Sequence, residues 1–221
     1  MSNDEGKLVN IASEQGEENI KLYNDEDSSF ILTYYMKSIV NDKAIVRIIK
    51  AVERMFRMSV EYNHYLGNIR KSTGFNNCSI FGGVTDDDAT IEFHHYPFTL
   101  YDIVQSVILK SLLNKQTFST FTLARDVTTL HFQNKVGVVP LSKTVHQMVH
   151  TGTLFLPLDP VLGDYVSFVE DFQDVFTNKI REKYNAIVKK TKELKETDFN
   201  PNILALDPQF LSTPALPVHD E

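Results

Sequence analysis

The stretch that decides the fold is residues 136–150, VGVVPLSKTVHQMVH. It begins with a short apolar run of the kind that forms a buried strand. Ser142 follows as a good helix N-cap, so a helix is predicted to begin there. His146 and His150 are four residues apart, and this spacing places both imidazoles on one face of the helix, as a metal site requires.

A second histidine pattern lies upstream, at the end of a β-like run at Ala89–Phe93. The sequence IEFHHYP, residues 91–97, closes this run with the tandem pair His94 and His95. Adjacent side chains on a strand point to opposite faces, so both histidines reach one site only at a twist or a strand end. Pro97 directly after the pair is typical of such an end.

These two pieces resemble the two halves of the ββα-metal motif of HNH (His-Me finger) nucleases, in the histidine pattern of the colicin-like DNases. The resemblance covers residues 89–97 and 136–151, and a weaker one extends to HNH-like proteins of tailed bacteriophages. It implies one bound divalent metal ion (Zn²⁺, Mg²⁺, Mn²⁺ or Ni²⁺) with a general base beside it. The residues implied are His94, His146 and His150 as metal ligands and His95 as the general base.

The function that the resemblance implies is hydrolysis of phosphodiester bonds in DNA. A divalent ion can stabilise the charge on the leaving oxygen, and a neutral imidazole can take a proton from water near pH 7. Two alternatives stay open. One is a catalytically inactive HNH-like module that binds nucleic acid or a host protein as a phage accessory or regulatory factor. The other is a structural zinc site that ties the helix to the hairpin.

The chain departs from the family pattern in two places. The central Asn of the motif, which orients the base histidine, normally lies nine residues before the first helix histidine, and Gly137 occupies that position here. Asn134 is the nearest replacement and is therefore the candidate orienting residue. The connection between the halves is also long, because residues 99–132 carry two predicted helices. This insertion brings His131, Asn134 and Lys135 near the second strand, where they could supply a replacement for the orienting group.

The rest of the body is predicted to be mainly helical, so the expected fold class is α+β, with the metal motif embedded in a helical domain over residues 29–195. Residues 41–70 have apolar side chains at three- and four-residue steps, and residues 161–195 are predicted as a long amphipathic helix or a broken pair. Basic side chains repeat along the first helix, which indicates a solvated face or a face toward phosphates. The candidate nucleic-acid-binding residues are Lys43, Arg47, Lys50, Arg54, Arg57 and Lys143.

The segment before the tandem histidines is predicted to be a hairpin or a longer loop. Cys78–Phe81 is a second β-like run, and Gly82-Gly83 and the acidic triplet at 86–88 separate it from the strand that ends in the histidines. Cys78 is the single cysteine of the chain, which excludes a disulfide framework and a cysteine-rich zinc site.

The net charge of the 221-residue chain is −7, and the acids are concentrated at its ends. Residues 1–28 hold eight acids and two bases and are predicted to be a disordered arm. Residues 196–221 hold five acids, no base and four prolines, and are predicted to be a flexible tail. The body between them has 20 bases and 16 acids. It is therefore compatible with a DNA partner, whereas the acidic termini suit a protein partner.

The composition excludes several classes of protein. With 42% hydrophobic and 23% charged residues, the chain is of ordinary globular type. No run approaches the ~20 apolar residues of a membrane span, and the acidic N-terminus lacks the apolar core of a secretory signal. No glycine-rich phosphate-binding motif is present. We therefore expect a cytoplasmic protein without a membrane partner, located in the host cytoplasm if a phage encodes it.

Overall fold

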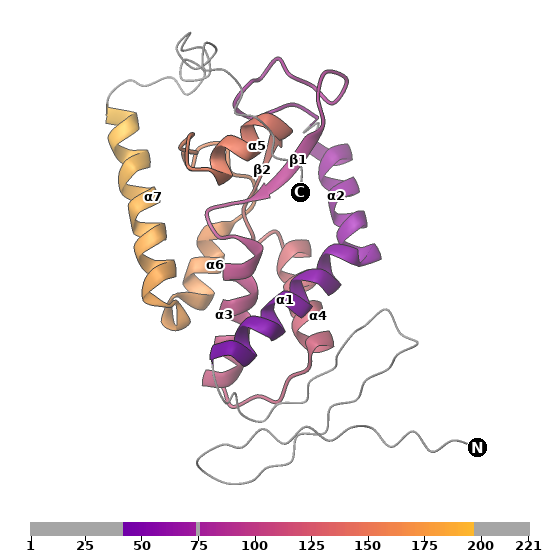
Figure 1. Ribbon diagram of the computed structural model, residues 1–221, viewed down its shortest axis with the longest axis vertical. Helices are drawn as coiled ribbons and strands as arrows, with labels where there is room; N and C mark the ends of the chain where they lie inside the picture. Colours follow the sequence, from indigo (N-terminus) through magenta and orange to yellow (C-terminus); the bar gives the residue numbers. More distant parts are fainter. Residues whose placement is uncertain (1–41, 74–75, 197–221) are drawn as a thin grey trace, which may run out of the picture.

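The computed structural model describes residues 42–73 and 76–196. Within this part of the chain a small two-stranded sheet is embedded among helices, so the predicted α+β class is confirmed (Figure 1). The predicted acidic arm, residues 1–28, lies outside the described residues, as does the predicted tail beyond Glu196. The elements in chain order are α1 (Asp42–Met58), α2 (Val60–Thr73), β1 (Ile91–His95), α3 (Leu100–Leu113), α4 (Thr120–Phe132), β2 (Val138–Ser142), α5 (Lys143–His150), α6 (Tyr165–Phe172), the 3₁₀ turn η1 (Gln173–Val175) and α7 (Asn178–Glu196).

The helix predicted over residues 41–70 is broken at Ser59, where α1 ends and α2 begins. The Ser59 hydroxyl donates to the carbonyl oxygen of Phe56 at 2.8 Å and accepts from the backbone N–H of Tyr62 at 3.0 Å. A side chain that takes these backbone groups offers the chain an alternative to a continuous helix. The break turns α2 away from the line of α1, so that the last turns of α2 lie beside the start of β1 (Figure 1).

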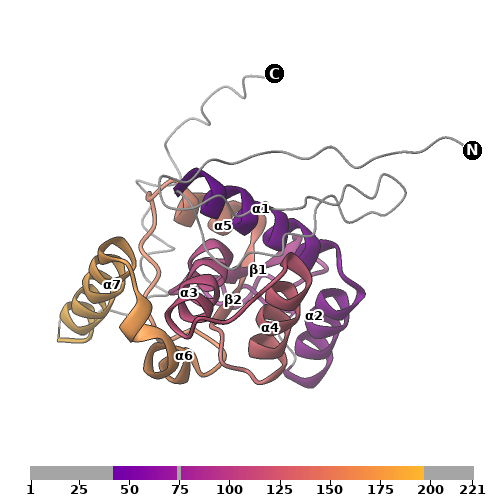
Figure 2. The same cartoon turned by 90° about the horizontal axis from the view of Figure 1, so that it is seen from below.

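The predicted insertion between the two halves of the motif forms α3 and α4. Each helix begins with a reciprocal capping pair, Thr99 with Asp102 and Ser119 with Thr122, which satisfies backbone N–H groups that the first turn leaves without partners. Both helices pack against α1 and against each other, as the view from below shows (Figure 2). This three-helix layer holds the larger hydrophobic core of the described chain.

The sheet consists of β1 and β2, paired antiparallel with a register that runs from Ile91 opposite Ser142 to His95 opposite Val138. The predicted β-like run at Cys78–Phe81 is wrong as a strand: apart from one isolated bridge between Asn77 and Thr85, this segment forms bends and turns. The physical reason is the tight loop beside it. The backbone N–H of Cys78 already bonds across that loop to the carbonyl oxygen of Val84 at 2.8 Å.

The C-terminal region is the broken pair of helices that the sequence left open. The rings of Phe168 and Phe176 both contact the ring of Phe98, with centroids 5.1 and 5.2 Å apart, and so attach α6 and η1 to the segment after β1. Helix α7 lies at the left edge of the view in Figure 1, and its Ile187 joins a second core cluster with residues of β2. Among the described helices, none combines the length and the apolar character needed to cross a membrane.

Candidate metal centre

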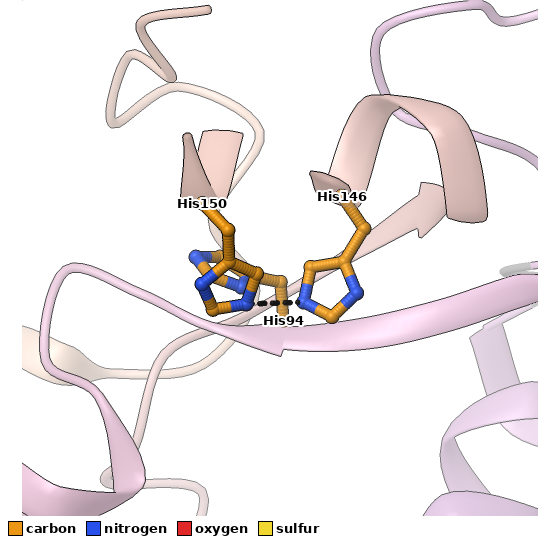
Figure 3. A group of neighbouring side chains, drawn as sticks. All are labelled: His94, His146 and His150. Atoms are coloured by element: carbon orange, nitrogen blue, oxygen red, sulfur yellow. Dashed lines mark hydrogen bonds between the residues drawn. The ribbon is translucent and has the colours of Figure 1, made fainter. Parts of the chain in front are cut away.

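Strand β1 and helix α5 bring three histidines together. His94 lies near the end of β1, while His146 and His150 lie one turn apart on the face of α5 that covers the strand (Figure 3). One ring nitrogen from each lies within 4.8 Å of one nitrogen of the other two. His94 of the tandem pair therefore converges with the two histidines spaced by four on the helix, whereas His95 does not join them.

The two ring nitrogens that α5 contributes to this cluster are close to the separation that a single ion requires. The Nε2 atoms of His146 and His150 are 2.9 Å apart, and nitrogens held at the Zn–N distance lie about 3.3 Å apart in a tetrahedral site. Two imidazole nitrogens this close have to share a proton or a metal ion between them. The donor set fits a zinc-like ion, and three ligands leave one coordination position open.

Glu92 orients one member of the metal cluster, His146. Its carboxylate accepts a hydrogen bond from Nδ1 of His146, so the other nitrogen, Nε2, faces His150 as a lone-pair donor. A carboxylate on the second nitrogen is the usual way in which a metal-binding histidine is oriented. Sequence reasoning missed Glu92, although a signal existed: it lies two residues before His94, and alternate residues of a strand share a face.

Two imidazoles of the metal cluster, those of His94 and His150, are held in their neutral form. Burial lowers the pKa of His94 to about 3, and the charges that His146 and His150 would carry act in the same direction. Burial, followed by the charge of His146, also lowers the pKa of His150. Because only the neutral imidazole binds a metal ion, these two side chains are ready to act as ligands at neutral pH.

The second member of the tandem pair, His95, points to the opposite side of β1. It is buried, with 6% of its surface exposed, and its Nε2 lies 2.9 Å from Nε2 of His131 on α4. His131 donates through Nδ1 to the carbonyl oxygen of Val127 at 2.7 Å, so its Nε2 accepts the proton from His95. The rings of Tyr62 and Tyr65 complete this second cluster.

Burial dominates the electrostatics of the second cluster as well. It lowers the pKa of His131 to about 4 and lowers the pKa of His95 well below its usual range, with the charge of His131 as the next cause. Both imidazoles are therefore neutral at pH 7. The described structure thus joins His95 to His131 and not to the three histidines of the metal cluster.

Gly137 cannot carry the side chain that the family motif has at this position. Its carbonyl oxygen accepts the backbone N–H of Tyr96 at 3.0 Å, and a Cβ placed on Gly137 would lie 2.0 Å from the carbonyl oxygen of Tyr96. Asn134, the candidate replacement, lies in the turn after α4 with a φ of 59° and an exposed side chain. The imidazole in contact with the buried His95 is that of His131.

The predicted nucleic-acid-binding side chains of α1 are all exposed, as is Lys143 at the start of α5. Arg57, in the last turn of α1, lies near enough to His150 for its charge to contribute to the low pKa of that imidazole. Arg70 on α2 was not among the sequence candidates. It donates to the carbonyl oxygen of Ile91 at 3.3 Å and lies 5.4 Å from the ring centroid of Phe93, so a further cation lies beside β1.

The chain matches a family of bacteriophage proteins. A protein-family model described as "Bacteriophage G278-like virion protein" matches residues 1–211. No curated protein and no solved structure matches the chain. The match confirms the bacteriophage origin that the sequence resemblance implied.

Proposed function

The chain belongs to the Bacteriophage G278-like virion protein family, and we propose that it is a phage nuclease that binds one divalent metal ion through His94, His146 and His150. In this proposal the protein hydrolyses phosphodiester bonds of DNA and carries an HNH-like ββα-metal motif with a two-helix insertion. The single observation that carries the proposal is the convergence of the three imidazoles from β1 and α5, whose ring nitrogens lie within 4.8 Å of one another.

The residues of the cluster have distinct tasks in this proposal. His94 is buried and provides the fixed ligand, whereas His150 is exposed, so the open coordination position is accessible from solvent. Glu92 orients His146. A bound divalent ion would stabilise the negative charge on the scissile phosphate and on the leaving oxygen. Arg57 lies near His150 and is placed to pair with a neighbouring phosphate.

The general base in this proposal is His95. Its Nε2–H is donated to His131, so a proton can be accepted only at Nδ1. That atom belongs to a side chain with 6% of its surface exposed. Water or substrate has to reach Nδ1 through an opening beside the strand end for His95 to act as the base.

The burial of His95 favours a second candidate function. If its imidazole serves only to join β1 to α4, the three-histidine site holds an ion without hydrolysing DNA. The protein is then a metal-stabilised module of the virion that binds nucleic acid or a host protein.

A cleavage assay with the full chain separates the two functions. Supercoiled plasmid is incubated with the wild-type protein and Mg²⁺, Mn²⁺, Ni²⁺ or Zn²⁺, and with the variants His95→Ala and His146→Ala. The nuclease proposal predicts nicking that both variants lose. His64→Ala is the matched control, because His64 is an exposed histidine on α2.

The same proteins are examined for bound metal by calorimetry. One ion per wild-type chain without any cleavage would establish the second candidate. Cleavage that survives in His95→Ala would contradict the role of His95 as the base. The absence of metal binding in the wild-type chain would overturn both functions.

A further inference from the structure

A groove with a volume of about 1070 Å³ runs along the outer surface between α1 and α4. Its floor is apolar and includes Met55 and Ala124. Several large apolar side chains along it are open to solvent: Met58 is 61% exposed, Val60 65%, Phe121 42% and Phe132 51%. A contiguous apolar surface of this kind on a water-exposed face is typical of a binding site.

The groove is bordered by positive charge. Lys50 and Arg54 from α1 and Arg125 from α4 line it, and all three side chains are exposed. Glu61 is the one acidic residue among the lining residues. The surface therefore suits an occupant that combines apolar side chains with negative charge.

We propose that the occupant is the N-terminal segment of the same chain, with residues 30–40 lying in the groove. This stretch, FILTYYMKSIV, contributes eight apolar side chains: Phe30, Ile31, Leu32, Tyr34, Tyr35, Met36, Ile39 and Val40. The residues before it, 1–28, hold eight acids and two bases. The N-terminal segment thus combines the apolar side chains and the negative charge that the groove suits, and the family match, residues 1–211, includes it.

The chain length allows this docking within one molecule. Arg54 lies twelve residues into α1, which places the middle of the groove about 18 Å from the start of the helix. The eleven residues 30–40 can span about 36 Å when extended. A segment that doubles back at the start of α1 can therefore run antiparallel to the helix along the whole groove.

Docking of this segment has a consequence for DNA binding. Lys50 and Arg54 line the groove and also belong to the predicted nucleic-acid-binding side chains. The acidic residues that precede the docked segment would compete with DNA for these two cations. Arg57 does not line the groove, so the cation whose charge acts on His150 stays available.

Photo-crosslinking in the full-length protein tests the docking. Thr129, an exposed residue that lines the groove, is changed to cysteine and labelled with a thiol-reactive benzophenone, while the buried Cys78 is left unchanged. Crosslinks to residues 30–40 of the same chain, identified by mass spectrometry in the monomer band, are the expected result. Lys192→Cys, on the exposed surface of α7, is the control and should give none of these crosslinks.

A second change in the labelled protein tests whether the apolar contact holds the segment in place. Adding Met58→Glu places a carboxylate in the groove and should lower the yield of these crosslinks about tenfold, because burying an unpaired charge is costly. Crosslinks to residues 197–221, crosslinks between two chains, or a yield that Met58→Glu does not change would each overturn the proposal, as would the absence of crosslinks.

Discussion

The two sides of strand β1 carry two histidine clusters with opposite properties. On one side, His94 meets His146 and His150 at a site that is partly open to solvent and backed by the carboxylate of Glu92. On the other side, His95 meets His131 among aromatic rings, and both are almost fully buried. Two neighbouring histidines on one strand therefore differ in their chemistry because a different helix packs on each face, α5 over His94 and α4 against His95.

The largest expected effect is the loss of metal binding when a ligand of the metal cluster is removed. His146→Ala removes one of three ligands and the partner of Glu92, so we expect the affinity for Zn²⁺ to fall by more than about 100-fold, beyond the effect of an outer carboxylate. Isothermal titration of the full chain measures this. His95→Ala serves as the comparison and should keep the affinity within about threefold. An equal loss in both variants would show that the two clusters act as one site.

Acid should destabilise the protein through the second cluster, in which His131 is buried against His95. The pKa of His131 is about 4 in the folded chain and near 6.5 in the unfolded chain. The unfolded chain therefore binds the proton first, and the stability present above pH 6.5 is lost as the pH falls toward 4. The loss from His131 is roughly 3 kcal/mol.

Urea unfolding of the metal-free protein at several pH values measures this acid sensitivity. His131→Gln has no titrating group at this position and should show a smaller loss between pH 6.5 and 4 than the wild-type chain. A variant with the same pH dependence as the wild type would exclude His131 as the cause.

Removal of the His131 imidazole from the second cluster should lower the stability of the protein and leave its metal binding intact. His131→Ala removes the acceptor of His95 Nε2–H and the packing against the rings of Phe56 and Tyr65. We expect the free energy of unfolding to fall by roughly 2–3 kcal/mol, from the unsatisfied donor and the cavity together. Chemical denaturation measures the change at pH 7.5. A stable variant that no longer binds metal would reverse the roles assigned to the two clusters.

The smallest expected effect concerns the carboxylate behind the open cluster. Glu92→Ala leaves Nδ1 of His146 without its acceptor, and we expect about a tenfold loss in Zn²⁺ affinity. Glu92→Gln keeps an acceptor oxygen without the charge and should lose less. Competition with a zinc-binding dye gives the order of the three proteins. If both variants bind as tightly as the wild type, Glu92 does not orient His146.

The local parts of the site could be predicted because they depend on short spacings. The step from His146 to His150 is one helical turn, so both side chains share a face wherever the helix lies. Helices α3 and α4 begin at capping pairs that are visible in the sequence. The break at Ser59 was missed, because apolar periodicity continues across it and only the hydroxyl bonds to Phe56 and Tyr62 mark it.

The residue in contact with His95 could not be predicted from spacing. Asn134 was the nearest residue of the expected type, but the left-handed turn after α4 leaves its side chain exposed. The contact with His95 comes from His131, which lies three residues before Asn134 on the buried face of α4. The glycine at position 137 is explained by the close approach of its backbone to the backbone of Tyr96. No side-chain pattern in the sequence reveals this contact.

The sequence by itself determined which histidines share a helix face, where α3 and α4 begin, and that His94 and His95 diverge on an extended strand. These properties follow from backbone periodicity over a few residues. Only the tertiary structure decided what each imidazole meets. The antiparallel pairing of β1 with β2 places α5 over His94 and Glu92, while the inserted α4 brings His131 to His95. Such contacts join residues 36 to 54 positions apart, and they depend on packing that short-range periodicity does not encode.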